Sequence, residues 1–222
     1  MNCPKCGSSE KSKAGFVKDV QRWQCKNCPC KYTRSTPKGL GAKTWALAEE
    51  LYASGVSLRR IGQLIGVSTV AVLKHMRHVD TSHSRLEPQD VTVVELDELC
   101  TFLTKKKRKI WVWLAVCRET RRILDWEMGC RGAKTLKRLW ERLKKFKIDV
   151  YCSDHWSVYL LVLPLGRLVQ SKAETYTAEQ IWSDLRHWIA RFKRRGKVVS
   201  RSLKDMEQAI AFHFHRVNTK AI

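Results

Sequence analysis

Three acidic residues of this 222-residue chain have the residue types and spacing of a metal-dependent catalytic site. Asp97 and Asp154 each end a β-like apolar run, and Glu179 lies at the start of a basic, amphipathic helical segment. Carboxylates that converge on one point repel one another unless cations lie between them. Two divalent metal ions in such a site can cleave and join phosphodiester bonds. We therefore expect these three residues to bind two catalytic Mg²⁺ ions.

Neighbouring acids compete for these positions. Glu95 and Glu98 lie beside Asp97, which is preferred because it follows the apolar run. Glu174 precedes the helix, and Glu179 is preferred to it for its helical placement. Any one strand-end Asp is more often a turn residue, and an acid early in a helix often only complements the helix dipole. The three acids in this order are what favours a catalytic site.

Aromatic and His residues near these acids have a simpler interpretation. His155, Trp156 and Trp182 could contact frayed DNA bases, but ordinary packing or solvation is the preferred interpretation. His213 and His215 are not expected to bind metal. The sequence therefore assigns no catalytic role to these side chains.

The segments around the acids predict an α+β domain over residues 91–200. Runs rich in Val, Ile and Trp predict strands, and apolar residues at helical spacing predict helices. The expected strands are Val91–Leu96, Lys109–Cys117, Arg122–Cys130, Ile148–Cys152 and Arg167–Gln170, and the expected helices are Ala133–Phe146 and Ala178–Arg195. This order is typical of the ribonuclease-H-like fold, in which carboxylates on neighbouring central strands meet. The last of these helices should bury Ile181, Leu185, Trp188, Ile189 and Phe192, and residues 201–222 should form a helical tail.

Four cysteines within residues 1–36 have the spacing of a structural zinc site. Two Cys-x-x-Cys pairs separated by 18 residues contain Cys3, Cys6, Cys25 and Cys28. They supply four thiolates for a tetrahedral Zn²⁺, and the residues between them can form the hairpin of a zinc ribbon. The segment is too small to be stable through its own core, so the metal would supply the missing stability. Cys30 could replace Cys28 as a ligand, but the Cys-x-x-Cys geometry favours Cys28.

A three-helix unit is expected over residues 43–80. Gly-Val-Ser occurs twice, and in each copy Gly can end one helix and Ser can cap the next. The expected helices are Lys43–Ser54, Leu58–Ile65 and Thr69–His78, packed through Leu47, Leu51, Ile61, Leu64, Ile65, Val70 and Leu73. The pattern is typical of a helix-turn-helix whose last helix enters the major groove through Lys74, His75 and Arg77. A structural bundle without DNA contacts is the alternative, and residues 81–90 are expected to be a linker.

The net charge of +22 indicates a polyanionic partner. Residues 186–204 contain eight basic and no acidic side chains, which suits the backbone of double-stranded DNA. The DNA contacts expected in this segment are Arg186, Arg191, Lys193, Arg194, Arg195 and Lys197. Nine cysteines, an odd number, and the lack of a signal peptide argue against a disulfide framework. The apolar runs are too short to span a membrane, so we expect a soluble, intracellular protein.

With these motifs the chain resembles the transposases of the insertion-sequence-one family, a branch of the Asp-Asp-Glu (DDE) recombinases. The resemblance covers nearly the whole sequence. It rests on the cysteine pairs, the three-helix unit, Leu96-Asp97-Glu98, Ser153-Asp154-His155-Trp156, and Tyr176-Thr-Ala-Glu179 followed by Ser183-Asp-Leu-Arg-His-Trp-Ile-Ala-Arg-Phe192. One departure is Trp182, which stands where members of the family tend to have Asn.

The resemblance implies a catalytic triad of Asp97, Asp154 and Glu179, with 24 residues between the second and third. It also implies binding to terminal inverted repeats and to target DNA, and a synapse built from a homodimer or higher multimer. A location in the bacterial cytoplasm, associated with the nucleoid, is expected for the same reason. The continuous chain would be the frameshift-fused active form, and its N-terminal half alone would act as a repressor. A non-catalytic DNA-binding repressor is the rival hypothesis, and a plain metal nuclease is a third.

Overall fold

The computed structural model describes residues 2–33, 40–104, 108–193 and 199–220 of the chain. The chain separates into two compact units, Met1–Trp45 and Ala46–Ile222. The second unit combines helices with a mixed sheet, which confirms the expected α+β class. In the described part of the chain, no helix is long and apolar enough to cross a membrane.

The first unit is a small antiparallel sheet. It contains β1 (Lys11–Val17), β2 (Val20–Cys25) and β3 (Lys31–Thr33) in that order. Lys18 and Asp19, which join β1 to β2, both have positive φ angles (48° and 61°), as the favoured two-residue hairpin turns require. The buried apolar side chains of its described residues are Cys3, Cys25 and Tyr32. So small a core gives little hydrophobic stabilisation.

Three helices follow, α1 (Ala42–Ala53), α2 (Leu58–Ile65) and α3 (Thr69–Met76), close to the expected bounds. Ser57 and Ser68 cap α2 and α3, because their hydroxyl oxygens accept hydrogen bonds from the backbone N–H groups of Arg60 and Ala71. Gly66 ends α2 with φ of 73°, a conformation that favours glycine. The Gly-Val-Ser repeats therefore set these boundaries as predicted.

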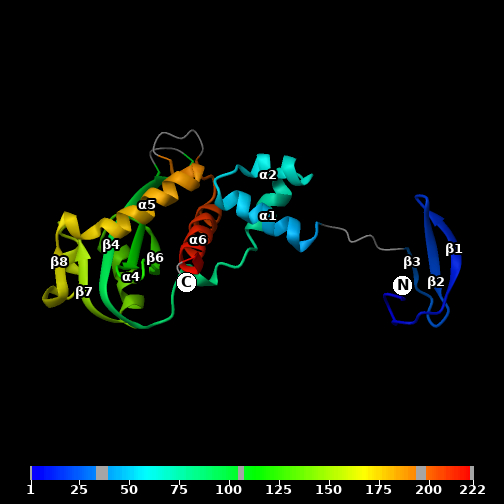
Figure 1. Cartoon of the computed structure of the whole chain (residues 1–222), viewed down its shortest axis with the longest axis horizontal. Helices are drawn as coiled ribbons and strands as arrows, with labels where there is room; N and C mark the ends of the chain where they lie inside the picture. Colours follow the sequence, from blue (N-terminus) through cyan, green and yellow to red (C-terminus); the bar gives the residue numbers. More distant parts are fainter. Residues whose placement is uncertain (1, 34–39, 105–107, 194–198, 221–222) are drawn as a thin grey trace. The chain divides into compact units, whose positions relative to one another are not determined.

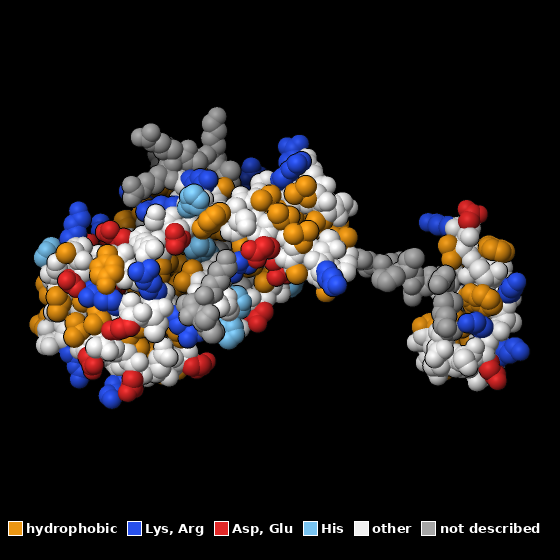
Figure 2. Space-filling model, in the orientation of Figure 1, with side chains coloured by type: hydrophobic (Ala, Val, Ile, Leu, Met, Phe, Trp, Pro, Cys, Tyr) orange, Lys and Arg blue, Asp and Glu red, His pale blue; other side chains and the backbone are white. Residues whose placement is uncertain are grey.

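The prediction of which residues pack these three helices together was partly wrong. Leu47, Leu64 and Val70 are 53%, 53% and 73% exposed, and hydrophobic side chains gather over the α1–α2 region in Figure 2. Ile61 is buried as expected, and the other buried residues of these helices are Ala48, Gly62, Val72 and Met76. The backbones approach closely where side chains are small, since a Cβ on Gly62 would lie 2.6 Å from the Val67 carbonyl oxygen. Two of the buried positions, Ala48 and Gly62, are therefore small residues that a search for large apolar side chains passes over.

A five-stranded sheet forms the centre of the second unit (Figure 1). Its strands are β4 (Asp90–Phe102), β5 (Lys109–Cys117), β6 (Ile123–Gly129), β7 (Lys147–Ser153) and β8 (Leu168–Gln170), in the spatial order β6-β5-β4-β7-β8. The first three are antiparallel, β7 is parallel to β4, and β8 is parallel to β7. The remaining helices are α4 (Ala133–Leu143), α5 (Tyr176–Trp188) and α6 (Leu203–Lys220). Single 3-10 turns occur at Ser82–Ser84, Tyr159–Leu161, Leu165–Arg167, Lys172–Thr175 and Ala190–Phe192.

Two apolar cores cover the two faces of this sheet. On one face, α4 packs its buried leucines against strand residues that include Val94 and Leu96. On the other face, α5 and α6 pack against strand residues that include Leu99 and Leu114. Because side chains alternate along a strand, the odd-numbered residues of β4 from Glu95 onward face α5 and α6. This alternation puts Asp97 on the α5 side.

The structure corrects the expected extent of α5 and the place of α6. The helix expected at Ala178–Arg195 spans Tyr176–Trp188, because Ile189 adopts an extended conformation (φ −102°, ψ 102°) that ends it. Trp188 is 41% exposed rather than buried, whereas Trp182 is 2% exposed. Helix α6 forms within the segment expected to be a helical tail, but it belongs to the core, as the burial of Met206, Ile210 and Phe214 shows.

We predict that Phe214→Ala lowers the free energy of unfolding by about 3–5 kcal/mol, the usual cost of truncating a buried aromatic residue. Phe214 is fully buried and packs edge-on against Trp126 with ring centroids 5.7 Å apart. Urea denaturation would measure the change. Val70→Ala, at a 73% exposed position, is the control and should change stability by about 0.5 kcal/mol or less. Equal stability of the two variants would contradict a core position for α6.

Candidate active site

Parallel pairing of β4 with β7 brings two of the expected acids to the same end of the sheet. Glu95 pairs with Cys152, and Asp97 and Asp154 each lie two residues further along. Strand β7 ends at Ser153, whereas β4 continues to Phe102 because it stays paired with β5. Asp97 therefore lies inside β4, opposite Leu114, and not at a strand end as expected.

The third expected acid, Glu179, lies in the first turn of α5. Burial raises the pKa of Asp97 to about 7, and the negative charges of Glu98, Asp154 and Glu179 add to this rise. The three expected acids are thus close enough to interact electrostatically. Among the residues that the structure describes, neither Asp97 nor Glu179 has a basic ion-pair partner. The mutual repulsion of Asp97, Asp154 and Glu179 is therefore not relieved by an ion pair with any described basic side chain.

The donor set suits a hard divalent cation. Carboxylate oxygens are the protein ligands that Mg²⁺ prefers, and Mg²⁺ usually retains several water molecules in its coordination shell. The carboxylate oxygens of the three acids lie farther apart than the ligand atoms of a compact metal site. In the described ranges only the four cysteines form a group of three or more potential ligands within 4.8 Å of one another. Asp97, Asp154 and Glu179 would therefore need water molecules or a bound phosphate to complete the coordination of a metal ion.

A tightly bonded loop holds Asp154 in place after β7. The carboxylate oxygen Oδ1 of Asp154 accepts a hydrogen bond from the backbone N–H of Trp156 at 3.0 Å. The Gln170 side-chain amide donates to the Asp154 carbonyl at 2.8 Å. The ring of Trp156 stacks on Trp113 with centroids 5.5 Å apart. Trp156 thus packs in the structure, in line with the preferred interpretation, and His155 is exposed.

Glu98, which follows Asp97, has partners on the opposite face of the sheet. Its carboxylate accepts hydrogen bonds from the Tyr159 hydroxyl at 2.8 Å and from Arg131 at 2.7 Å. The Arg131 guanidinium in turn lies 4.6 Å from the ring centroid of Trp111 and 4.3 Å from that of Trp156. Glu98 therefore connects β4 to the loop that holds Asp154.

Glu95, the other competitor of Asp97, is fully buried and bonded to Arg118. Its second carboxylate oxygen accepts hydrogen bonds from the backbone N–H groups of Thr177 and Ala178 in α5. Arg118 also pairs with Glu174, the acid that competed with Glu179. Arg118 was not among the residues predicted from the sequence. Its only signal there was a basic residue one position after the end of an apolar strand.

A sequence comparison decides the class to which this site belongs. The profile of the family described as IS1 transposase matches residues 91–220, which is more than half of the chain and includes all three acids. The chain belongs to the IS1 transposase family. These proteins serve DNA recombination at insertion elements, and the resemblance inferred from the motifs is confirmed.

Named relatives in the IS1 family agree with this match. The chain is 31% identical over 118 residues to the insertion element iso-IS1n protein InsB of Shigella dysenteriae, covering 53% of this chain and 90% of that protein. It is 29% identical over 139 residues to an IS1 protein InsB of Escherichia coli K12, covering 62% of this chain and 81% of that protein.

Solved structures give weaker matches. A chain of the Mos1 transposase paired-end complex with the left transposon end aligns at 11% identity and a TM-score of 0.24, covering 70% of this chain and 62% of that one. A pre-cleavage Mos1 transpososome aligns at 10% identity and a TM-score of 0.28, covering 87% and 79%. TM-scores this low support no inference about this IS1-family chain.

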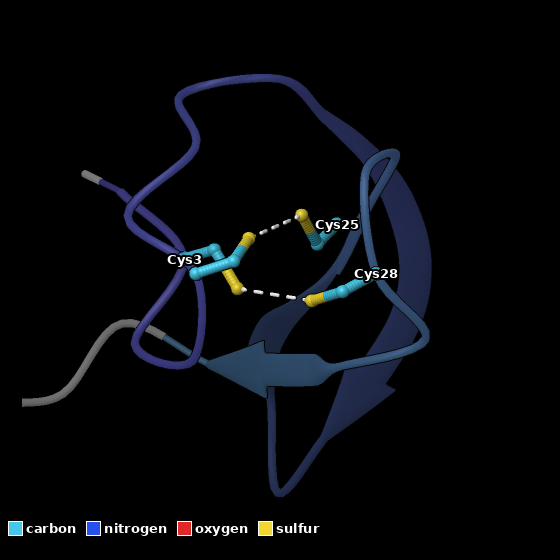
Figure 3. A group of neighbouring side chains, drawn as sticks. Cys3, Cys25 and Cys28 are labelled. Atoms are coloured by element: carbon cyan, nitrogen blue, oxygen red, sulfur yellow. Dashed lines mark hydrogen bonds between the residues drawn. The ribbon is translucent and has the colours of Figure 1, made fainter.

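The cysteines of the first unit form a second candidate metal centre (Figure 3). The Sγ atoms of Cys3 and Cys28 lie 3.6 Å apart, and those of Cys6 and Cys25 lie 3.5 Å apart. Four sulfurs around a tetrahedral Zn²⁺ with Zn–S bonds of about 2.3 Å would be about 3.8 Å apart. The four cysteines therefore have the spacing that a zinc ion needs, and Cys30 is not part of this group.

The basic residues expected to contact DNA at the end of α3 have different environments. Lys74 is exposed. The His75 ring nitrogen Nε2 lies 2.7 Å from a carboxylate oxygen of Glu49. Arg77 forms two hydrogen bonds, of 2.6 and 3.0 Å, with the carboxylate of Asp205 in α6. Of these three, only Lys74 has no such partner among the described residues.

The basic segment after α5 is only partly described. Arg186 is half-buried, and the Arg191 guanidinium donates to the backbone carbonyl of Asp205 at 3.0 Å. Lys193 is exposed. The other expected contacts, Arg194, Arg195 and Lys197, lie outside the described residues.

Proposed function

We propose that this IS1-family protein is a DNA transposase that binds the terminal inverted repeats of its element and catalyses metal-dependent strand cleavage and strand transfer. The observation that supports this most is the placement of the three acids within the region that matches the family. Pairing of β4 with β7 brings Asp97 and Asp154 to one end of the sheet, and the first turn of α5, which contains Glu179, is bonded to β4 through Glu95. In the reaction, water attacks the phosphodiester at the element end. The 3′-hydroxyl that is released then attacks target DNA at the same site.

The three carboxylates would hold the catalytic Mg²⁺ ions, which supply an activated nucleophile and charge stabilisation for the leaving oxygen when bound. The chain's own contribution is to orient these carboxylates. The competing acids support this assignment, because Glu95 and Glu98 are each bonded to an arginine. Asp97 and Glu179 form no ion pair with a described arginine or lysine, so their carboxylates are available to bind a cation.

We assign the sheet and its helices to the ribonuclease-H-like fold. Three antiparallel strands followed by α4 and a parallel strand β7 beside the first strand support this assignment. The proposed catalytic domain starts at residue 91 and continues to residue 200, with α6 packed on it. Residues 81–90 are the proposed linker, and in the structure they pack on this domain: the Leu86 N–H donates to the Leu124 carbonyl, and Asp90 begins β4.

Residues 43–80 are proposed as a helix-turn-helix that reads the element end. The capped helices α2 and α3 and the exposed Lys74 support this proposal. Residues 1–36 are proposed as a zinc ribbon, supported by the cysteine geometry. The net charge of +22 supports binding to the DNA backbone. A homodimer or higher multimer would hold the two element ends together.

The test of the proposed function is cleavage of a labelled duplex that contains the inverted repeat flanking the gene. Wild-type protein with Mg²⁺ should release a 3′-hydroxyl end and join it to a second, unlabelled duplex. Binding without cleavage, in both Mg²⁺ and Mn²⁺, would contradict the proposed activity. That result would favour a non-catalytic repressor that uses only the ribbon and the helix-turn-helix.

For the DNA-reading helix, we predict that Lys74→Ala weakens binding to the inverted repeat. Removal of one lysine–phosphate ion pair should reduce the slope of log K against log salt by about one. Fluorescence anisotropy at several salt concentrations would measure this slope. Lys134→Ala is a matched control, because Lys134 is exposed on α4, and its slope should equal that of the wild type. An unchanged slope in Lys74→Ala would contradict the proposal that α3 contacts DNA through Lys74.

A further inference from the structure

We infer that Glu95 and Arg118 are a positioning pair that fixes the start of α5 and thereby places Glu179 beside Asp97 and Asp154. This inference rests on the proposed function, since it concerns the same carboxylate site. Neither residue would touch metal or substrate. Their role is to set where the third carboxylate lies.

Glu95 acts as a helix cap supplied by a different element. The backbone N–H groups in the first turn of a helix have no partners within that helix. At the start of α5 the N-cap residue Thr175 makes no side-chain capping hydrogen bond. Instead, the buried carboxylate of Glu95 in β4 accepts from Thr177 N at 2.7 Å and from Ala178 N at 3.0 Å. The start of α5 is therefore attached directly to the strand that contains Asp97.

Arg118 balances the buried charge of Glu95 and ties down the segment before α5. Its Nε donates to Glu95 at 2.8 Å, and this matters because an unpaired buried carboxylate is strongly destabilising. Its Nη2 donates to the Glu174 carbonyl at 2.8 Å, and its Nη1 lies 2.7 Å from the Glu174 carboxylate. Its guanidinium also lies 5.2 Å from the Tyr176 ring centroid. One arginine thus joins β4 to both sides of the turn into α5.

The connection between this pair and the site is short. Glu179 follows Ala178 directly, so the two N–H groups that Glu95 binds belong to the same helical turn as the third carboxylate. Asp97 lies two residues from Glu95 on the same face of β4. A metal site tolerates displacements of only about 0.5 Å in its ligands. Loss of the cap should therefore weaken metal binding while leaving DNA-end binding unchanged.

The experiment compares wild type with Glu95→Gln, which keeps the size of the side chain but removes its charge. Metal binding is measured with Mn²⁺ by the loss of the free-ion electron paramagnetic resonance signal. Cleavage of the labelled DNA end is titrated with Mg²⁺. Partners that orient metal ligands usually change affinity about 10- to 100-fold. We expect at least a ten-fold weaker Mn²⁺ affinity and a matching rise in the Mg²⁺ needed for half-maximal cleavage.

Asp125→Asn is the matched control. Asp125 is 4% exposed and pairs with Arg142 and Arg85, so its replacement also breaks a buried ion pair, but in β6, away from the carboxylate site. Its Mn²⁺ affinity should equal that of the wild type. Equal Mn²⁺ affinities for wild type and Glu95→Gln would overturn the inference. Complete loss of Mn²⁺ binding in Glu95→Gln would make Glu95 a ligand itself and would also overturn it.

Amide hydrogen exchange separates this inference from the proposed function. In Glu95→Gln the N–H groups of Thr177 and Ala178 should exchange faster than in wild type, with or without metal. If wild type neither binds Mn²⁺ nor cleaves DNA, the proposed function fails, while faster exchange would still support the cap. Unchanged exchange would overturn the cap itself. Arg118→Lys, which cannot make the same set of hydrogen bonds, provides a second variant if Glu95→Gln does not fold.

Discussion

Asp97→Asn should reduce strand cleavage and strand transfer by about 10³-fold or more while leaving DNA-end binding unchanged. The substitution keeps the size of the side chain but removes the negative charge that a divalent ion needs. Several kcal/mol of transition-state stabilisation depend on such an ion, and each 1.36 kcal/mol corresponds to a ten-fold change in rate. Single-turnover cleavage of a labelled end with Mg²⁺, beside anisotropy binding on the same duplex, would measure both quantities.

The matched control for this prediction is Asp149→Asn, because Asp149 is an exposed acid in β7. It should cleave at the wild-type rate. Asp154→Asn and Glu179→Gln should behave like Asp97→Asn if all three carboxylates share the metal ions. Loss of binding to the same degree as cleavage would mean that Asp97 is structural. Retained cleavage in Asp97→Asn would mean that Asp97 is not a metal ligand and that another acid binds the metal ions.

Removal of zinc should unfold residues 1–36 without unfolding the rest of the chain. The described part of this unit buries few apolar side chains, so the apparent zinc-binding energy of about 10–16 kcal/mol would be its main source of stability. Nuclear magnetic resonance spectra of the ribbon amides, recorded before and after a zinc-selective chelator, would follow the loss. Far-ultraviolet circular dichroism would show that the larger unit keeps its helices.

Cysteine variants sharpen this prediction. Cys28→Ser should unfold the ribbon, whereas Cys30→Ser should leave it folded, because Cys28 and not Cys30 belongs to the group of four neighbouring cysteines. The opposite result would show that Cys30, and not Cys28, is the fourth zinc ligand. A ribbon that stays folded in metal-free protein would contradict the zinc assignment. Mg²⁺-dependent cleavage by the larger unit, if it survives chelation of zinc, would show that the two metal centres are independent.

Sequence reasoning was most successful where local chemistry fixes the backbone. Helix α2 and strand β5 have the predicted bounds, because capping residues and β-branched or aromatic runs act within a few residues of the elements they define. The cysteine group followed from spacing alone, since two Cys-x-x-Cys turns leave few ways to place four sulfurs. The order of the three antiparallel strands, α4 and β7 along the chain was also predicted from these local patterns.

The sequence failed where the partner of an element is distant along the chain. It ended β4 at Leu96, but pairing with β5 extends the strand to Phe102 and places Asp97 inside it. It treated Glu95 as a rival of Asp97, because nothing near Glu95 indicates that α5, about 80 residues later, needs a cap.

By itself, therefore, the sequence determined the class of fold, the cysteine site, the family, and the three acids that we propose as catalytic. Tertiary structure alone decided which neighbouring acids are bonded to arginines, which face of each short helix is buried, and that α6 completes the core. The physical reason is the distance along the chain between the residues that interact. Capping, turn and strand preferences depend on adjacent residues, whereas burial and ion pairing depend on which distant surfaces meet when the chain folds.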